Sequence, residues 1–130
     1  MKPHMKVLLF GSPGECETVA RILADHRSGP GTVAYEHTAD LERFELCMAT
    51  WMPSLVIVLA DGAAGLESVY RSRSRRPNLP VFWFSDDREF GMQSYRLDCA
   101  YFSTKPATQE KINSALKRCN HIGISYTVPV

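Results

Sequence analysis

Three short runs of apolar residues constrain the fold of this chain more than any other feature. Residues 7–10, 55–59 and 81–84 contain no polar side chain, and a glycine or proline lies within two residues of one end of each run. A strand with one wet face alternates apolar and polar residues, so a short run without alternation indicates a strand buried on both faces. Burial on both faces is typical of a parallel sheet that helices cover from both sides.

Segments with the apolar spacing of helices separate these runs. Cys16, Val19, Ala20 and Leu23 recur at positions i, i+3, i+4 and i+7, which predicts one face of a helix. Strand and helix alternate five times along the chain. This order predicts an α/β fold, a doubly wound five-stranded parallel sheet with helices on both faces and its chemistry at the carboxyl ends of the strands. We expect the other strands near residues 32–35 and 101–104, and the other helices near residues 40–48, 66–70, 90–97 and 108–119.

Length and charge exclude several classes of protein. The 130 residues match one compact domain, and 15 basic against 14 acidic residues leave a formal charge of +1. A nearly neutral chain has no bulk electrostatic reason to coat nucleic acid, and no apolar stretch approaches the roughly 20 residues of a membrane span. We expect a soluble, cytoplasmic domain over residues 1–119. Residues 120–130 have no helical period and are expected to form a linker or the start of a truncated output domain.

The cysteines, histidines and glycines argue against a metal centre or an enzyme. The four cysteines form no C-x-x-C pair and the four histidines lack ligand spacing, so we expect buried or half-buried thiols, no metal and no cofactor. The loop at 11–14 lacks the Gly-Lys-Ser/Thr ending of a nucleotide loop, and Ser12 is expected to cap the following helix. The strand-end loops contain no nucleophile–base pair, so they do not support a divergent flavodoxin-like enzyme, and we expect no catalytic residue.

Five stretches of the chain match the motifs of one known family in order and spacing. The motifs of that family are a strand of the type P-D-L-V-x-L-D, a G-L-E helix start, an apolar strand ending in Thr or Ser, an E-Y-A helix start, and an aromatic strand ending in Lys-Pro. On these motifs the chain resembles the receiver domain of bacterial response regulators, especially receivers attached to LytTR-type DNA-binding domains. The matching stretches are residues 53–59, 65–67, 80–85, 89–95 and 101–106, within a resemblance that spans roughly residues 5–119.

The resemblance assigns roles to three residues that would read a phosphoryl group. Lys105, followed by Pro106, matches the lysine that senses the phosphate. Ser85 matches the switch hydroxyl, and Phe102 matches the switch aromatic. The same resemblance implies an acidic pair after the first strand, which binds a divalent cation, and a phospho-acceptor aspartate at the end of the third strand.

The residues that would accept a phosphoryl group are absent from those positions. The acidic pair falls on Gly11 and Ser12, and the acceptor aspartate falls on Leu59. Leucine cannot be phosphorylated, and a Gly-Ser pair does not bind magnesium strongly. The chain therefore resembles a degenerate receiver, or pseudo-receiver, of the two-component type. The other carboxylates near these loops are Asp61, which is the alternative acceptor, and Asp86, Asp87 and Glu15.

The resemblance implies a non-enzymatic signal-transduction module that works without phosphorylation and controls an output domain, with transcription as the output. We expect a homodimer in which Tyr95 and Tyr101 contribute to the interface if they are exposed. DNA binding would belong to an output domain, by family inference alone, and we expect no direct contact of this domain with nucleic acid. The arginine-rich segment 71–76 is predicted to be a solvated helix end, or else a contact for an acidic partner surface or for DNA phosphates.

Two alternative functions remain open at this point. One is a receiver that is phosphorylated at a slipped position, Asp61. The other is a pseudo-receiver that senses a small anion, because Lys105 has lost the acidic partners that the family provides. A buried ammonium without a partner is costly, so Lys105 is expected either to bind an anionic ligand or to pair with Asp61, Asp86 or Asp87.

Overall fold

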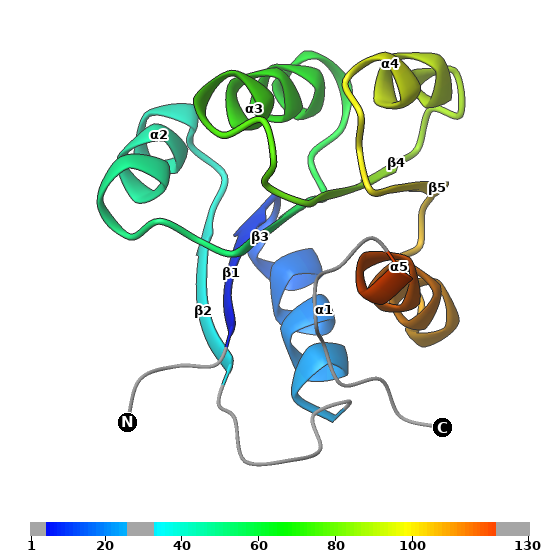
Figure 1. The fold of residues 1–130 in the computed structure, drawn as a ribbon. Coiled ribbons are helices and arrows are strands. Elements are labelled where there is room, and N and C mark those ends of the chain that lie inside the picture. Colours follow the sequence, from blue (N-terminus) through cyan, green and yellow to red (C-terminus); the bar gives the residue numbers. More distant parts are fainter. Residues whose placement is uncertain (1–4, 26–32, 122–130) are drawn as a thin grey trace.

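Five parallel strands in the order β2-β1-β3-β4-β5 form the sheet of this protein, and five helices pack on it (Figure 1). The structure is a computed structural model that describes residues 5–25 and 33–121. The predicted doubly wound α/β fold is confirmed. In chain order the elements are β1 Met5–Phe10, α1 Pro13–Asp25, β2 Val33–Thr38, α2 Leu41–Thr50, β3 Leu55–Val58, α3 Gly62–Arg75, β4 Val81–Ser85, α4 Phe90–Arg96, β5 Tyr101–Thr104 and α5 Gln109–His121.

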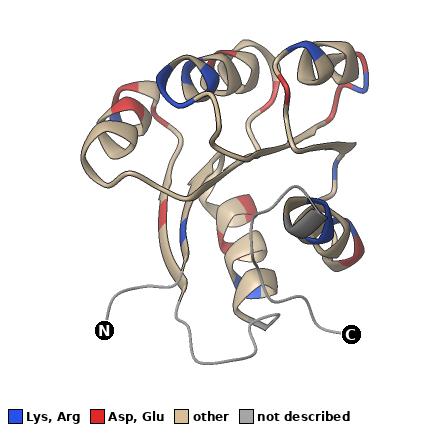
Figure 2. Cartoon of the chain, in the orientation of Figure 1, with Lys and Arg blue, Asp and Glu red and all other residues tan. Residues whose placement is uncertain are grey.

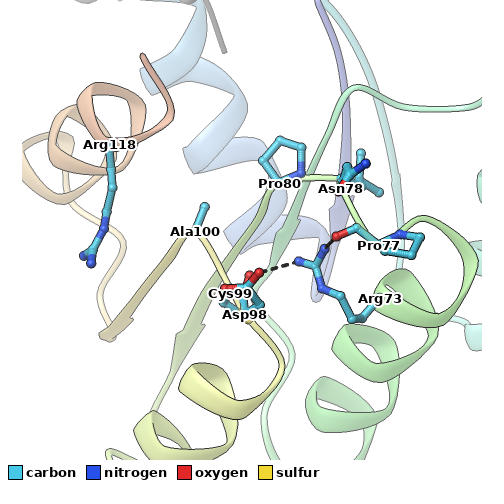
Figure 3. A pocket seen from close by; sticks show the side chains of 9 residues that line it. Arg73, Pro77, Asn78, Pro80, Asp98, Cys99, Ala100 and Arg118 are labelled. Carbon is cyan, nitrogen blue, oxygen red and sulfur yellow. Dashed lines mark hydrogen bonds between the residues drawn. The ribbon is translucent and has the colours of Figure 1, made fainter. Parts of the chain in front are cut away.

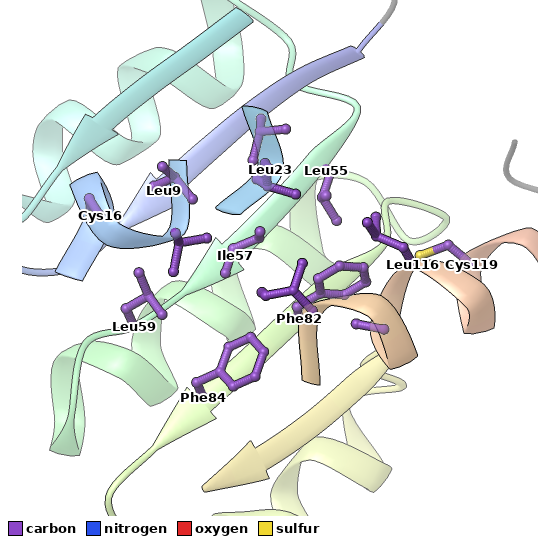
Figure 4. Close-up of a cluster of buried hydrophobic side chains, with 14 of the residues drawn as sticks. Leu9, Cys16, Leu23, Leu55, Ile57, Leu59, Phe82, Phe84, Leu116 and Cys119 are labelled. Carbon is purple, nitrogen blue, oxygen red and sulfur yellow. The ribbon is translucent and has the colours of Figure 1, made fainter. Parts of the chain in front are cut away.

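Each face of the sheet has its own apolar core. Helices α1 and α5 lie on one face, and α2, α3 and α4 lie on the other (Figure 1). Strands β1, β3 and β4 send alternate side chains to the two faces, so the runs without polar residues supply both cores. On the α1 side, Leu9, Ile57 and Phe82 belong to a cluster that also contains Cys16 and Leu116 (Figure 4).

Two early boundaries differ from the predicted ones because pairing and capping set them. Strand β2 runs to Thr38 rather than ending near residue 35, since all six of its residues pair with β1. Helix α2 begins one residue late because Asp40 is its N-cap, where its carboxylate accepts hydrogen bonds from the amides of Glu42 and Arg43.

Two later helices are longer than the apolar spacing predicted. Helix α3 begins at Gly62, since Asp61 takes the N-cap position in extended conformation without a side-chain cap hydrogen bond. Helix α5 continues to His121, past the predicted end at residue 119. The predicted tail lies outside the described residues from position 122 onward, so the division into residues 1–119 and 120–130 stays a prediction.

The arginine-rich segment of α3 is used within the domain. Arg71 and Arg75 reach Glu45 of α2, with nitrogen–oxygen distances of 4.0 and 2.5 Å. In the α4–β5 connection, Arg73 donates to the carbonyl of Leu97 at 2.8 Å and to that of Asp98 at 3.2 Å, the second of which Figure 3 shows. These contacts join α3 to α2 and to the α4–β5 connection, and they favour a structural role of the segment within the domain over a contact with an acidic partner or with DNA phosphates.

The four cysteines are free thiols that are buried or half-buried, as predicted. Burial raises the pKa of Cys16 to about 11 and the pKa values of Cys99 and Cys119 to about 12, so these thiols stay protonated at neutral pH. Within residues 5–25 and 33–121, no cluster of three or more His, Cys, Asp or Glu side chains is arranged to hold a metal ion. None of the described helices combines the length and the apolarity that crossing a bilayer requires.

Candidate functional site

The carboxyl ends of the strands bring the predicted site residues to one edge of the sheet, called here the carboxyl edge. Gly11 follows β1, Leu59 follows β3, Ser85 ends β4 and Lys105 follows β5. The amide of Leu59 donates to the carbonyl of Phe10 at 2.7 Å, and the amide of Lys105 donates to the carbonyl of Ser85 at 3.0 Å. Backbone hydrogen bonds between neighbouring strands therefore set the relative positions of these residues.

Leu59, at the position that the resemblance gives to the phospho-acceptor, is a core residue. Its side chain is 1% exposed and belongs to the apolar cluster beneath α1 (Figure 4). Gly11 fits against it, because a Cβ on Gly11 would lie 2.8 Å from the Cβ of Leu59. Neither position carries a nucleophile or an oxygen ligand on its side chain.

Through two ion pairs, Lys105 joins the β5–α5 connection to the first turn of α1 and to the β3–α3 connection. Its Nζ lies 2.6 Å from Oε2 of Glu15 and 3.1 Å from Oδ2 of Asp61, and its side chain is 12% exposed. The other oxygen of Asp61, Oδ1, accepts the amide N–H of Asp86 at 3.1 Å. Of the three partners expected for Lys105, Asp61 is the one in contact with its ammonium, and Asp86 contributes its backbone to the same group. We call Lys105, Glu15 and Asp61 the lysine cluster.

Burial and pairing act in opposite directions on the charged groups of the lysine cluster. Burial favours the neutral form of Asp61, but the Asp86 amide and the Lys105 ammonium outweigh it and lower the pKa of Asp61 below its ordinary value of 3.8. Burial also disfavours the ammonium of Lys105, but Glu15 and Asp61 outweigh it and raise the pKa of Lys105 above its ordinary value of 10.5. Both groups therefore stay charged through the neutral pH range.

Replacing Lys105 by methionine is expected to lower the free energy of unfolding by about 1 kcal/mol at pH 7, a modest value because solvent screens the two partly exposed carboxylates. The contribution of Asp61 is present above pH 3.8 and is lost as the pH falls through its lowered folded-state pKa. The contribution of Lys105 is present below pH 10.5 and is lost as the pH rises through its raised pKa. Urea unfolding at about pH 3, 7 and 11 measures this difference.

Lys117→Met is the matched control for this prediction, since Lys117 is an exposed lysine of α5 outside the lysine cluster. It should change the unfolding free energy by less than about 0.5 kcal/mol. A loss for Lys105→Met that is the same at all three pH values would contradict the ion-pair explanation.

Glu15 is the site residue that sequence reasoning did not connect to Lys105. Ser12 caps α1 as predicted: its Oγ accepts the amide N–H of Glu15 at 3.3 Å and donates to Oε1 of Glu15 at 2.9 Å. This S-x-x-E capping box was the signal available in the sequence, because it places Glu15 in the first turn of the helix that starts at the carboxyl edge. The contact of the second oxygen with Lys105 depends on the path of the β5–α5 connection, which no local pattern specifies.

Ser85 and Phe102 lie on the strands that the resemblance implies. Ser85 is fully buried, and its Oγ accepts the amide N–H of Asp87 at 3.1 Å. Phe102 is half-buried and packs edge-on against Trp83, with the ring centroids 5.4 Å apart. The hydroxyl thus holds its own loop, and the ring is part of the core beneath α4.

The two tyrosines predicted for an interface differ in exposure. Tyr95 on α4 is 84% exposed, and Met92 one turn earlier is 60% exposed. Tyr101 is half-buried and packs against Phe82 and Phe84, at centroid distances of 6.4 and 5.8 Å. The exposure expected of an interface residue is therefore present at Tyr95 and not at Tyr101.

A large pocket lies at the opposite edge of the sheet, where β4 and β5 begin. It has a volume of about 620 Å³ and is bounded by Arg73, Asp98, Cys99 and Arg118, among others (Figure 3). Arg73 is committed to backbone carbonyls there, and burial raises the pKa of the Cys99 thiol to about 12. The predicted site residues lie at the other end of the strands.

Comparison with solved structures identifies the fold. The signal receiver domain of a modulated diguanylate cyclase from Desulfovibrio desulfuricans G20 is 19% identical, with a TM-score of 0.69 over 91% of this chain and 94% of that one. The HemR receiver domain from Leptospira biflexa is 19% identical, with a TM-score of 0.70 over 96% and 98%. The receiver domain of Francisella response regulator 1452 is 14% identical, with a TM-score of 0.70 over 92% and 99%. Neither a protein-family model nor a curated protein matches the chain. The chain therefore has the fold of response regulator receiver domains.

Proposed function

We propose that this chain is a non-enzymatic receiver module that transmits a signal to an output domain without aspartyl phosphorylation. The observation that carries the proposal is the lysine cluster. Lys105, which by resemblance would neutralise an incoming phosphoryl group, is already bound to two carboxylates of the chain, Glu15 and Asp61. Leu59 fills the expected acceptor position with buried hydrocarbon.

Aspartyl phosphorylation needs three groups at the carboxyl edge. A carboxylate must attack the phosphoryl group, oxygen ligands must hold a divalent cation, and a lysine must neutralise the developing charge. The expected carboxylate positions carry Leu59, Gly11 and Ser12. The Lys105 ammonium contacts both Glu15 and Asp61. It therefore already links the segments that a bound phosphoryl group would otherwise bring together.

Asp61 is the alternative acceptor, and its contacts argue against that role. It is the N-cap residue of α3, and both of its oxygens have partners, the Asp86 amide and the Lys105 ammonium. The remaining carboxylate from the first loop, Glu15, is itself bound to Lys105. Phosphorylation at Asp61 would have to break the ion pair that stabilises the site.

Incubation with a small phosphodonor such as acetyl phosphate plus magnesium is expected to leave the chain unmodified. Intact mass and a phosphate-affinity gel measure the product. Trp83 packs against Phe102, the residue at the switch aromatic position, so its fluorescence would report a movement of that ring. In a Trp51→Phe background, we expect the Trp83 emission to stay unchanged. Asp61→Asn is the control. A phosphorylated species that disappears in Asp61→Asn would overturn the proposal in favour of the slipped acceptor.

The pairing of Lys105 also removes the reason for an anion sensor. That hypothesis rested on an ammonium without acidic partners, whereas Lys105 has two carboxylates within 3.1 Å. A further anion would have to displace one of them from a short ion pair. We therefore do not include anion sensing in the proposed function.

The exposed face of α4 supports the output side of the proposal. Tyr95 and Met92 form an apolar patch one helical turn long on the domain surface, and exposed aromatic and methionine side chains are enriched at protein interfaces. We propose that this patch contributes to a homodimer or to contact with the output domain. A cytoplasmic location, an output in transcription and the absence of direct DNA contact are further parts of the proposal, and they rest on the resemblance to response regulator receivers.

A further inference from the structure

A pocket of about 240 Å³ lies beside the lysine cluster, between α1 and the β5–α5 connection. It opens at the carboxyl edge, where doubly wound sheets bind their ligands. Leu59 and Val19, each 1% exposed, lie beneath the pocket as its floor. Its accessible apolar wall comes from Pro106 and Ala107 of the β5–α5 connection, and α1 contributes Gly14, Glu15 and Thr18.

The side-chain polar atoms that line this pocket are hydrogen-bond acceptors. Thr18 Oγ1 donates its proton to the carbonyl of Gly14 at 3.0 Å, so this oxygen can act toward a ligand only as an acceptor. The Glu15 carboxylate accepts from the Ser12 hydroxyl and the Lys105 ammonium. A carboxylate has about four acceptor positions, and Glu15 is 41% exposed, so it retains positions for a further donor. A ligand that fits these groups must donate hydrogen bonds.

The charge around the pocket indicates that the donor group of the ligand is positively charged. The connections 11–15, 59–62, 85–89 and 105–107 contain five carboxylates and two cations, a formal charge of 2 − 5 = −3. Figure 2 shows acidic residues, coloured red, in loops that follow the strands and at the start of α1. The net negative charge of these segments attracts cations, and the Glu15 carboxylate in the first turn of α1 offsets the positive end of the helix dipole at this pocket. An ammonium group supplies both the positive charge and the donors.

The volume limits the ligand to a small molecule. At about 30 Å³ for each water-sized group, 240 Å³ holds about eight such groups. A chain of about five carbons with one ammonium group fills most of that space. Its carbons can cover the apolar wall while its head stays at the mouth beside Glu15.

We propose that this pocket binds a small primary alkylammonium, with the head on Glu15 and Thr18 and the alkyl chain against Pro106 and Ala107, above the floor that Leu59 and Val19 form. The proposal goes beyond the proposed function, because it supplies a chemical input for a module that lacks a phosphorylation site. The bound head would share the Glu15 carboxylate with Lys105. Ligand occupancy would therefore act directly on the lysine cluster, which joins the β5–α5 connection to α1 and to the β3–α3 connection.

Titration of the ¹⁵N-labelled chain with n-pentylammonium, followed by amide chemical shifts, tests the proposal. We expect saturable shifts of the Gly14, Thr18 and Ala107 amides with a Kd of about 1 mM, a normal affinity for a six-atom ligand. Amides of the opposite pocket, at Asn78 and Ala100, are the internal reference and should not move. Pentanoate should bind at least about tenfold more weakly, and 1-pentanol should fall between the two.

Matched variants assign the binding to this pocket. Glu15→Gln is expected to weaken n-pentylammonium at least about tenfold, whereas Asp87→Asn, which removes one negative charge outside the pocket lining, should change the Kd by less than about twofold. Ala107→Met adds atoms to the apolar wall and should abolish saturable binding. The Ala107→Met variant tests the proposal even if Glu15→Gln does not fold.

Three results would overturn the proposal. They are the absence of saturable shifts up to about 20 mM n-pentylammonium, binding of pentanoate as tight as that of the ammonium, and unchanged binding in a folded Ala107→Met variant. None of them bears on phosphorylation, which is measured separately with the phosphodonor, so the two proposals can fail independently.

Discussion

Substituting aspartate for Leu59 is expected to lower the free energy of unfolding by about 5 kcal/mol at pH 7. Leu59 is 1% exposed, and loss of its buried side chain costs about 2–3 kcal/mol. Placing a carboxylate in the same apolar cluster accounts for the rest, because burial without polar partners penalises the charge. Since burial raises the pKa of such a carboxyl, the loss should grow as the pH rises from about 4 to 7.

Urea unfolding measures this loss, and Leu59→Met is the control. Methionine conserves volume and apolarity, so its cost should stay below about 1.5 kcal/mol. Together, Leu59→Asp and Leu59→Met show whether position 59 only corresponds in place to the phospho-acceptor or can also hold its carboxylate. Near-normal stability of Leu59→Asp, together with magnesium-dependent phosphorylation of the new carboxylate, would contradict the interpretation of Leu59 as a core residue.

Gly65→Ala is expected to destabilise the protein by about 3 kcal/mol, although alanine has the higher helix propensity. A Cβ at Gly65 would lie 2.2 Å from the carbonyl oxygen of Ala60 and 3.5 Å from Nε1 of Trp83. The first of these atoms is backbone, so the connection between β3 and α3 would have to move. Overpacking of this kind typically costs 1–3 kcal/mol or more, which exceeds the roughly 1 kcal/mol gained in propensity.

Thermal and urea unfolding of Gly65→Ala measure the effect, with Gly14→Ala as the matched control. Gly14 also lies in a helix, and nothing stands within 4 Å of a Cβ placed there, so its substitution should stay within about 1 kcal/mol of the parent. Because Ala60 precedes Asp61, a shift in Gly65→Ala should also weaken the Asp61–Lys105 pair. Equal stability of the two variants would show that the close approach at Gly65 is not maintained in solution.

Apolar runs predicted where the central strands end, and the resemblance to receiver domains assigned the candidate site residues to those ends. Lys105, Ser85 and Phe102 follow or occupy strands at the expected positions, and Leu59 lies where β3 ends. The sequence did not show which of Tyr95 and Tyr101 is exposed, because exposure depends on local packing. Tyr101 lies on β5 and packs against Phe82 and Phe84 of the neighbouring strand, while Tyr95 projects from the short helix α4 and stays 84% exposed.

The sequence alone determined the layers of this protein and the edge where its site lies. Apolar runs without polar residues require burial on both faces, and alternation with helices leaves a parallel sheet as the way to bury them. Only the tertiary structure decided that Glu15 and Asp61 share the Lys105 ammonium and that Gly11 fits against Leu59. Such contacts depend on loop paths and side-chain rotamers that bring distant residues within a few ångströms, whereas periodic patterns report only which face of an element is buried.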